Sequence, residues 1–521
     1  MSRTDKLFLK FILIVITTIG VVFCILNFRN NNGDPLINLV FSKSFGKGFF
    51  YYGNEGPKSG STSPLFVMLI APCYLFFKNP PLILIKILYF FLYLVSAYLF
   101  ILLSQKIYKK NEFLSFLISA SYLGNIYFGY LTATLYDSIL LFLFLICFYY
   151  FFVEIYKKIK ENKTILPKES FLLGFFASLS LLSRPDSFIA IIICYFWLFK
   201  RVTRSLGKNY IRNIILSIFI TILLGGGFYL FLGIQTGHFI PTSVLARATL
   251  KSNGFIPNLI KIFTSHFWVY YLLFGYFILV LLAFVLKKKM NLTLNVDSDL
   301  FNLFLITIII YLPIFFYSGE ARYISSAFPS MILISALFAF FYFNSLNKKI
   351  LIKISLLLLI CSTTIYLWGT CKILKALPVY SEDIIFEKGL CDLLNKIAKP
   401  IEKIAVYEIQ SQYCLIPRTL SLDGIVGGEI IPYFQKKSDL LDFFLRYKPD
   451  YLVLSNYVLY RPEYHNTVLE RLYYNDNNLK IGDKYTEKSI HFTKIAENQS
   501  ELNQKLRGMR FWVSLYKLNY D

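Results

Sequence analysis

One carboxylate stands alone in a basic part of the chain. Asp34, in "NNNGDPLINLVFSKSF" (residues 30–45), has no other acid within ten positions on either side and follows about twenty apolar residues, the length of a membrane span. A carboxylate at a membrane edge has its pKa raised by desolvation, and it can then take a proton from a hydroxyl group as a general base. The competing interpretation is structural, because Asp34 would cap a short helix that begins at Pro35.

Three cations have the chemistry to bind a phosphate group: Arg247, Lys251 and Arg322. A guanidinium group binds phosphate through paired hydrogen bonds and keeps its charge in partly dry surroundings, so it stabilises the negative charge that develops on a departing phosphate. Alternatives stay open for all three. Arg247 and Lys251 could reach lipid headgroups instead, and Arg322 could pair with Glu320.

Further polar residues occur in short turns between apolar runs. Asp137 is either a second acid that assists Asp34 or the cap of the helix that follows it. Arg184 and Asp186 lie two positions apart in a tight turn, where an ion pair within the turn or between helices competes with contact to a substrate. For His238, a role as a hydrogen-bonding loop residue competes with a role in catalysis.

The elements that must position these residues belong to a polytopic membrane protein. Hydrophobic residues make up 56% of the chain and charged residues only 16%, which is outside the range of soluble domains. The net charge of +23 would suggest nucleic acid as the partner of a soluble chain, but most Lys and Arg fall in short loops between apolar runs, where they set topology. We therefore expect a lipid bilayer as the partner and no nucleic acid.

Eleven apolar runs are candidates for membrane spans. With a cytoplasmic N-terminus, every strongly basic connection falls on one side, as the positive-inside rule demands. The stretch 63–77 is short and holds Pro64 and Pro72, so it predicts an interfacial or re-entrant helix rather than a span. The eleven runs cover residues 7–27, 80–104, 112–129, 137–156, 170–183, 187–200, 211–233, 267–286, 300–317, 323–345 and 350–370.

This topology gathers the polar residues on one side of the membrane. It places the first outer loop (28–62) and everything after about residue 371 outside the cytoplasm, together with the acids and cations considered above. Ionisable residues that are retained near membrane depth usually line a site, which favours function on this side. We expect a transmembrane catalytic module over residues 1–377.

The chain changes character over residues 378–521. Charge rises, and strand-like runs such as "KIAVYEI" and "DYLVLS" alternate with the helix-like "SDLLDFFLRYK". This pattern predicts a small α/β domain, which the topology places outside the cytoplasm. Neither GxGxxG nor GxxxxGK[ST] occurs, so the sequence holds no nucleotide-binding fingerprint.

Five short motifs follow one another along the chain: "GSTSPLF" (60–66), "LYDS" (135–138), "LSRPDSF" (182–188), "GHFIPTSVLAR" (237–247) and "ARYISSAFPS" (321–330). With the lone acid after the first span, this order resembles the GT-C glycosyltransferases. The pattern is most similar to the bacterial branch of terminal arabinofuranosyltransferases, with kin among protein mannosyltransferases and lipid A aminoarabinose transferases. The resemblance covers nearly the whole chain and includes the tail segments "IAVYEIQSQ", "TLSLDGIVG" and "YKPDYLVL".

The resemblance assigns roles to particular residues. It makes Asp34 the catalytic base, while Gly33 stands where the family has a partner acid. It places Asp137 at a second acidic position, Ser243 at a threonine position and Arg247 at a lysine position of the family pattern. The full set of residues predicted to contact substrate is Arg184, Asp186, His238, Ser243, Arg247, Lys251, Glu320 and Arg322.

The resemblance implies a mainly α fold: a polytopic transmembrane bundle of about eleven spans with a small extracytoplasmic α/β domain. It implies an integral membrane glycosyltransferase that moves a sugar from a polyprenyl-phosphate donor to a cell-envelope glycan, lipid or protein on the outer side of the bacterial cytoplasmic membrane. The alternatives are a lipid-linked sugar flippase or transporter, which would show inverted repeats, and an O-antigen type polymerase, which lacks the first-loop acid.

No cofactor is expected. A divalent metal is conceivable, but no DxD pattern occurs near Asp34 or Asp137, and no His/Cys cluster has the spacing of a metal site. The sequence therefore gives a metal no support.

Overall fold

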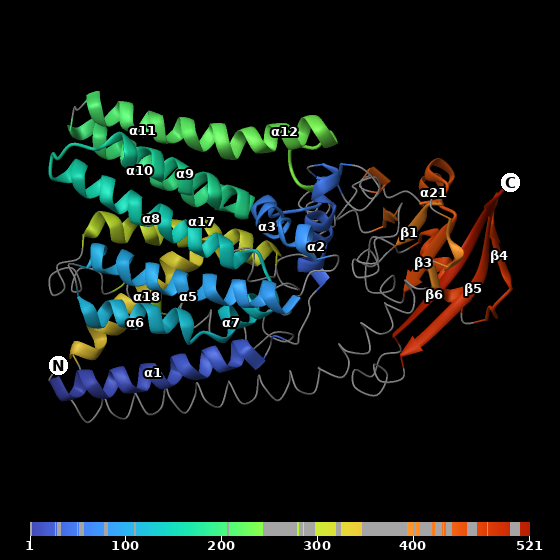
Figure 1. Cartoon of the computed structure of the whole chain (residues 1–521), viewed down its shortest axis with the longest axis horizontal. Helices are drawn as coiled ribbons and strands as arrows, with labels where there is room; N and C mark the ends of the chain where they lie inside the picture. Colours follow the sequence, from blue (N-terminus) through green and yellow to red (C-terminus); the bar gives the residue numbers. More distant parts are fainter. Residues whose placement is uncertain are drawn as a thin grey trace. The chain divides into compact units, whose positions relative to one another are not determined.

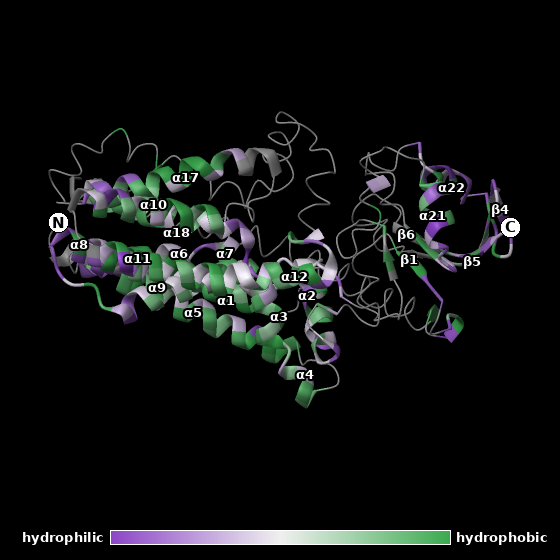
Figure 2. Cartoon of the chain, turned by 90° about the horizontal axis from the view of Figure 1, so that it is seen from above, coloured by the Kyte–Doolittle hydropathy of each residue, from purple (hydrophilic) through white to green (hydrophobic). Residues whose placement is uncertain are grey.

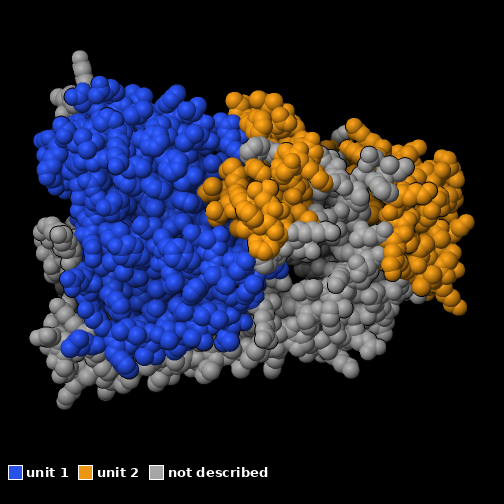
Figure 3. All heavy atoms as spheres, viewed as in Figure 1, with its two compact units in different colours: residues 1–30, 81–228, 252–373 blue, residues 31–80, 229–251, 374–521 orange. Residues whose placement is uncertain are grey.

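The computed structural model divides into two compact units (Figure 3): unit 1 comprises residues 1–30, 81–228 and 252–373, and unit 2 comprises residues 31–80, 229–251 and 374–521. The predicted domain boundary at 377/378 lies outside the described residues and stays a prediction. The structure describes residues 3–26, 28, 33–48, 50–51, 57–77, 82–108, 111–205, 208–242, 279–280, 285, 297–318, 325–345, 393–394, 396–399, 402–406, 419–422, 430, 432–433, 440–455, 466–476, 478–500 and 511–521.

Unit 1 is a bundle of apolar helices that run side by side (Figure 1). Nine of the eleven predicted runs coincide with described helices, while 267–286 and 350–370 lie almost wholly outside the described residues. The helices are α1 (Arg3–Leu26), α5 (Leu82–Ile107), α6 (Glu112–Leu123), α7 (Ile126–Ala133), α8 (Ser138–Lys160), α9 (Pro167–Ser183), α10 (Phe188–Ser205), α11 (Lys208–Ile220), α17 (Ser298–Ser318) and α18 (Phe328–Ser345).

Three of the described helices are long and apolar enough to cross a membrane: Leu82–Ile107, Ser138–Lys160 and Asn209–Thr236. The last of these consists of α11, a π-helical turn (Thr221–Gly226) and α12 (Gly227–Thr236). Hydrophobic residues dominate the helices of the bundle, as Figure 2 shows. The prediction of a helical membrane protein is therefore confirmed, while the count of eleven spans stays a prediction.

One predicted span is divided in the structure. The run 112–129 forms two helices, because α6 ends at Leu123 and α7 begins after Asn125. The side chain of Asn125 accepts a hydrogen bond from the backbone N–H of Tyr127 at 2.9 Å, which caps α7. A helix boundary made by one amide side chain does not change the hydropathy of the run, so the apolar pattern did not reveal it.

Aromatic rings fill the core of the bundle. The ring of Tyr122 on α6 lies 4.9 Å from the ring of Tyr93 on α5 and 5.0 Å from that of Phe128 on α7, measured between centroids. The Tyr93 hydroxyl donates to the Tyr122 carbonyl at 3.1 Å. This arrangement satisfies the polar end of a buried tyrosine while its ring adds apolar contact.

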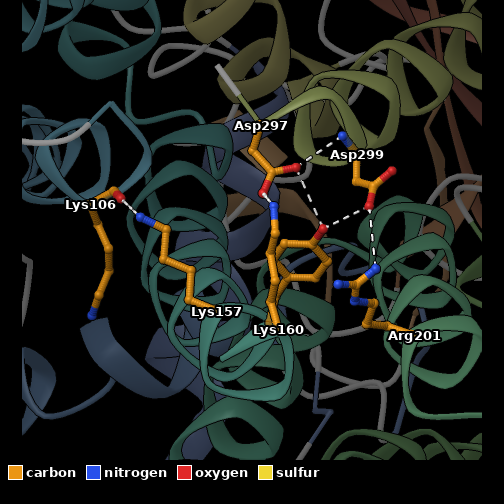
Figure 4. A network of polar contacts seen from close by, with 7 residues as sticks. Lys106, Lys157, Lys160, Arg201, Asp297 and Asp299 are labelled. Carbon is orange, nitrogen blue, oxygen red and sulfur yellow. Dashed lines mark hydrogen bonds and ion pairs between the residues drawn. The ribbon is translucent and has the colours of Figure 1, made fainter. Parts of the chain in front are cut away.

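Helix α8 carries polar networks at both of its ends. At its C-terminal end, Lys160 Nζ lies 2.8 Å from Asp297 Oδ2, and the Tyr156 hydroxyl donates to Asp299 Oδ2 at 3.0 Å (Figure 4). Arg201 of α10 approaches the same Asp299 oxygen at 3.9 Å. Asp137 precedes the other end, and 23 helical residues span about 35 Å, close to the thickness of a bilayer core.

Unit 2 contains short helices from the predicted first outer loop (28–62) and from the predicted interfacial stretch (63–77). They are α2 (Gly33–Ser44), a 3-10 turn (Phe45–Lys47), α3 (Pro64–Ile70) and α4 (Cys73–Phe76).

The α3–α4 pair is amphipathic. Phe66 is fully buried, whereas Leu75 and Phe76 are each 82% exposed. Because the pair is too short to cross a bilayer and leaves large apolar side chains uncovered, these features agree with the predicted interfacial helix.

The C-terminal part of unit 2 is a six-stranded mixed sheet of order β2-β1-β3-β6-β5-β4. Strands β1, β2 and β3 are parallel, and β6, β5 and β4 continue the sheet in antiparallel pairs. Its elements are β1 (Ile404–Val406), β2 (Thr419–Ser421), α21 (Leu441–Tyr447), β3 (Tyr451–Ser455), α22 (Val468–Asp476), β4 (Lys484–Glu487), β5 (Ile490–Ser500) and β6 (Phe511–Tyr520).

Both faces of the central strand β3 are buried. Leu452 and Leu454 belong to the apolar cluster formed with α21 and α22, while Tyr451 and Val453 belong to a second cluster. This alternation follows the period of two along a strand. The predicted small α/β domain is therefore confirmed, and its side of the membrane stays a prediction.

Candidate active site

Asp137 occupies the turn between α7 and α8. The preceding Leu135 has φ 63°, in the left-handed region that residues other than glycine rarely adopt, and this conformation stores strain in the turn. Asp137 stands at the N-cap position of α8, yet its side chain makes no capping hydrogen bond. Its Oδ1 atom instead accepts a hydrogen bond from Arg184 Nη1 at 2.8 Å. In the structure, the side chain of Asp137 therefore does not cap α8.

Arg184 joins two carboxylates. It lies in the turn between α9 and α10, where Nη1 contacts Asp137 and Nε donates to Asp186 Oδ1 at 2.9 Å. The side chains of Arg184 and Asp137 are 7% and 6% exposed, and that of Asp186 is 20% exposed. Burial acts against the charge of the guanidinium, but the two carboxylates outweigh it, so the pKa of Arg184 is raised above its usual value.

Asp186 is also bonded from two other elements. The Tyr311 hydroxyl of α17 donates to the Asp186 carbonyl, and Ser326 Oγ, just before α18, donates to Asp186 Oδ2 at 3.1 Å. We call Asp137, Arg184, Asp186, Tyr311 and Ser326 the carboxylate–guanidinium cluster. It brings together three of the sequence motifs, "LYDS", "LSRPDSF" and "ARYISSAFPS", from positions up to 189 residues apart along the chain.

The charge of this cluster limits its chemistry. One guanidinium between two carboxylates leaves a formal charge of −1, and Arg184 is already engaged by both acids. Such a group favours hydroxyl or cationic ligands over phosphate, and it ties together the ends of the surrounding helices. The predicted pairing of Arg184 with Asp186 in the turn is present, and the additional partner is Asp137.

Asp34 lies in the first turn of α2, which begins at Gly33, two residues before the predicted start at Pro35. Its side chain is outside the described part of the chain. Helix α2 packs through Ile37 and Phe41 against α3, so the first-loop acid sits on an element with its own apolar support.

A second meeting of motifs occurs in unit 2. The backbone N–H of Thr242, in "GHFIPTSVLAR", donates to the carbonyl of Ser59 at 3.0 Å. Two residues on, Ser61 Oγ donates to Asn38 Oδ1 of α2 at 2.8 Å. We call residues 57–63 the serine segment. It connects the helix that carries Asp34 with a turn that lies some 180 positions further along the chain.

His238 belongs to this turn. Its backbone N–H donates to Thr236 Oγ1 at 3.3 Å, and Gly237 adopts φ 75°, which permits the chain to reverse after α12. The structure thus gives His238 a backbone role in the loop. The other predicted substrate contacts, Ser243, Arg247, Lys251, Glu320 and Arg322, lie outside the described residues.

Sequence reasoning missed several polar residues. Tyr311 is one tyrosine in an apolar run and gave no signal of its own. Lys86 did give one, because it is an ionisable residue inside a predicted span. It is 2% exposed, and its Nζ donates to the carbonyl of Phe28 at 2.7 Å, just beyond the end of α1. Among the described residues, no group of three or more His, Cys, Asp or Glu side chains is arranged to hold a metal ion.

The structure combines an apolar helical bundle, which has polar clusters at both ends of the long helix α8, with a small mixed sheet that follows in sequence. These features define an integral membrane protein with an additional sheet domain. No family model matches the chain, and no curated protein matches it in sequence. Among solved structures it is similar to the crystal structure of ArnT from Cupriavidus metallidurans bound to undecaprenyl phosphate, with a TM-score of 0.55 and 11% sequence identity. The similarity covers 98% of this chain and 98% of that chain. The chain therefore has the fold of this solved structure, which agrees with the GT-C resemblance of its motifs.

Proposed function

We propose that the chain is a glycosyltransferase of the cytoplasmic membrane that transfers a sugar from a polyprenyl-phosphate donor to a cell-envelope acceptor. The observation that carries the proposal is the likeness of fold over 98% of both chains to a protein whose structure holds undecaprenyl phosphate. The convergence of motifs in the carboxylate–guanidinium cluster and in the serine segment supports it further.

Asp34 is the base in the proposed reaction. Its carboxylate takes the proton of an acceptor hydroxyl, whose oxygen attacks the anomeric carbon of the donor sugar. The bond from this carbon to the phosphate oxygen breaks, and polyprenyl phosphate leaves with the bonding electrons. Because the acceptor oxygen attacks from the face opposite the departing phosphate, the anomeric configuration is inverted. Arg247, Lys251 and Arg322 are the cations proposed to stabilise the charge that develops on the departing phosphate. No metal is proposed.

The charge of the helix ends supports an outward-facing site. The last turn of α8 carries Lys157, Lys158 and Lys160, and an end rich in lysine favours the cytoplasmic side. Asp137, at the other end of the same helix, then faces outward. We propose that the C-terminal sheet domain also lies outside the cytoplasm, as the eleven-span topology requires.

The test is Asp34→Asn in the full-length protein. The amide cannot accept the acceptor's proton, so we expect product formation to fall at least 100-fold, the lower range for loss of a general base, while the protein accumulates normally. Product is measured with membranes that contain lipid-linked sugars, and Asp442→Asn, on α21 of the sheet domain, is the matched control. If Asp34→Asn formed product at an unchanged rate, Asp34 would have only a structural role in α2, and the proposed mechanism would be wrong.

The same assay separates the competing functions. A transferase releases free polyprenyl phosphate as it forms product, whereas a flippase or transporter moves the donor without breaking the bond between sugar and phosphate. A lipid analysis that detects sugar movement without released polyprenyl phosphate would contradict the proposed function.

A further inference from the structure

Two hydroxyl groups of the serine segment are buried without a hydrogen-bond partner in the described part of the chain. Ser59 is 2% exposed and Ser63 is fully buried, and neither Oγ atom has a partner. Ser63 stands at the N-cap position of α3, yet its side chain makes no capping hydrogen bond. An unpaired buried hydroxyl destabilises a folded protein, so two of them within five residues of one segment are candidates for contact with a ligand.

The serine segment is anchored at its middle. Ser59, Gly60, Ser61 and Ser63 are buried, while Lys58 and Thr62 are partly exposed. The backbone N–H of Ser63 donates to Ser61 Oγ at 3.2 Å, so the segment turns locally around Ser61. Ser61 is in turn fixed by its hydrogen bond to Asn38, so the segment is held against α2.

The position of this segment connects it to the proposed base. Residues 34 and 38 are one helical turn apart on α2 and share a face of the helix. Because Ser61 is bonded to Asn38, the middle of the serine segment meets α2 on the face that also bears position 34. The four residues from 34 to 38 correspond to about 6 Å of helix rise, so a saccharide ring held by the segment could reach position 34.

The chemistry of the serine segment selects the ligand. Serine hydroxyls are neutral and both donate and accept hydrogen bonds, as do the hydroxyl groups of a sugar ring. A phosphate group would call for several cations or N–H donors, and the serine segment offers a single cation, Lys58; an acyl chain offers no hydrogen bond at all. We propose that Ser59 and Ser63 form a subsite for the hydroxyl groups of a saccharide ring beside Asp34. The ring belongs either to the sugar of the donor or to that of the acceptor, and the proposal rests on the proposed transferase function.

The test uses full-length protein with Ser59→Ala, Ser63→Ala and the double substitution. Each change removes one oxygen atom and adds no volume, so folding is retained and the thermal midpoint stays equal or rises. We expect the KM for one sugar-bearing substrate to increase roughly 5- to 10-fold for each lost hydrogen bond. An increase for the donor assigns the subsite to the donor sugar, and an increase for the acceptor assigns it to the acceptor.

Two controls make the result specific. Ser170→Ala removes a buried hydroxyl on α9 that likewise has no partner in the described residues, and it should leave both KM values unchanged. Undecaprenyl phosphate, which carries no sugar, serves as the probe for binding of the lipid phosphate, and its thermal shift should be the same in the wild type and the double variant.

Three outcomes would overturn the inference. Unchanged KM values in the double variant would leave the hydroxyls as packing groups, and the proposed transferase function would stand. A weaker thermal shift with undecaprenyl phosphate would assign the hydroxyls to phosphate instead of sugar. Failure of the wild type to transfer any sugar from a panel of undecaprenyl-phosphate pentoses and hexoses would remove both the proposed function and this subsite.

Discussion

Replacing Arg184 by methionine tests whether the carboxylate–guanidinium cluster holds the helix bundle together. The change keeps an unbranched side chain but removes the guanidinium and its hydrogen bonds to Asp137 and Asp186, at 2.8 and 2.9 Å. A charge-assisted hydrogen bond contributes about 1.5–3 kcal/mol, so the two together contribute about 3–6 kcal/mol. The substitution also leaves two carboxylates without their cation, and breaking a buried ion pair in this way costs about 3–5 kcal/mol in measured cases. We therefore expect Arg184→Met to lower the free energy of unfolding by about 3–5 kcal/mol.

The neighbouring substitutions should form a ranked series. Asp137→Asn removes one charged contact at a site that is 6% exposed, so its expected cost is about 1.5–3 kcal/mol. Asp186→Asn should cost less, because this carboxylate is 20% exposed and solvent screens it. The double variant Asp137→Asn with Arg184→Met should be destabilised by less than the sum of its parts, since it no longer buries an uncompensated carboxylate at position 137.

The assay measures the thermal midpoint of the purified protein in detergent. The midpoint is taken from the fraction of protein that remains monodisperse after heating. Lys168→Met, an exposed cation on α9, is the matched control and should change stability by no more than about 0.5 kcal/mol. An Arg184→Met midpoint equal to that of the control would refute the structural reasoning. If that variant also lost product formation, contact with substrate would become the role of Arg184.

Two further predictions concern packing and acid stability. Gly174→Ala would place a Cβ atom against the carbonyl oxygen of Ser217 on α11 and should lower the free energy of unfolding by about 1–3 kcal/mol. Gly226→Ala is the control, because its Cβ would meet only a side-chain carbon at 3.7 Å and should be tolerated. The thermal midpoints of the two variants in detergent are compared. In the sheet domain, burial raises the pKa of Glu487 but hydrogen bonds led by that from Arg471 outweigh it, so the pKa lies below 4.5. Its stabilisation is therefore present above pH 4.5 and is lost as the pH falls through the lowered value, and Glu487→Gln should flatten this acid dependence when unfolding is followed by circular dichroism.

Local patterns explain the parts of the fold that the sequence predicted. Apolar runs of sufficient length form helices in a bilayer because every backbone polar group must be satisfied within the segment. The short length and the two prolines of 63–77 predicted an interfacial or re-entrant helix rather than a span, and the structure divides this stretch into α3 and α4 around Pro72. The turn "LSRPDSF" likewise keeps Arg184 and Asp186 together, since residues two apart in a tight turn are neighbours whatever the rest of the chain does.

The same local patterns explain the C-terminal domain. Alternating strand-like and helix-like runs predicted an α/β domain, and β1, α21 and β3 fall within them. The order of the strands was beyond the sequence, because β6, the last strand, inserts between β3 and β5. Strand order depends on which edges are free when the last strand pairs, and hydropathy along one strand does not encode this.

Contacts between distant residues were decided by tertiary structure alone. The sequence showed Asp137 and Arg184 as separate candidates 47 positions apart, and it gave no sign that one guanidinium would join Asp137 to Asp186. Nor did it show that Thr242 would bond to Ser59, or that the hydroxyl groups at 59 and 63 would be buried without partners. Composition and periodicity fix which segments become helices, because these depend on neighbours along the chain. Which helix ends meet depends on how the apolar faces pack together, and the polar residues of the candidate site acquire their partners only at that stage.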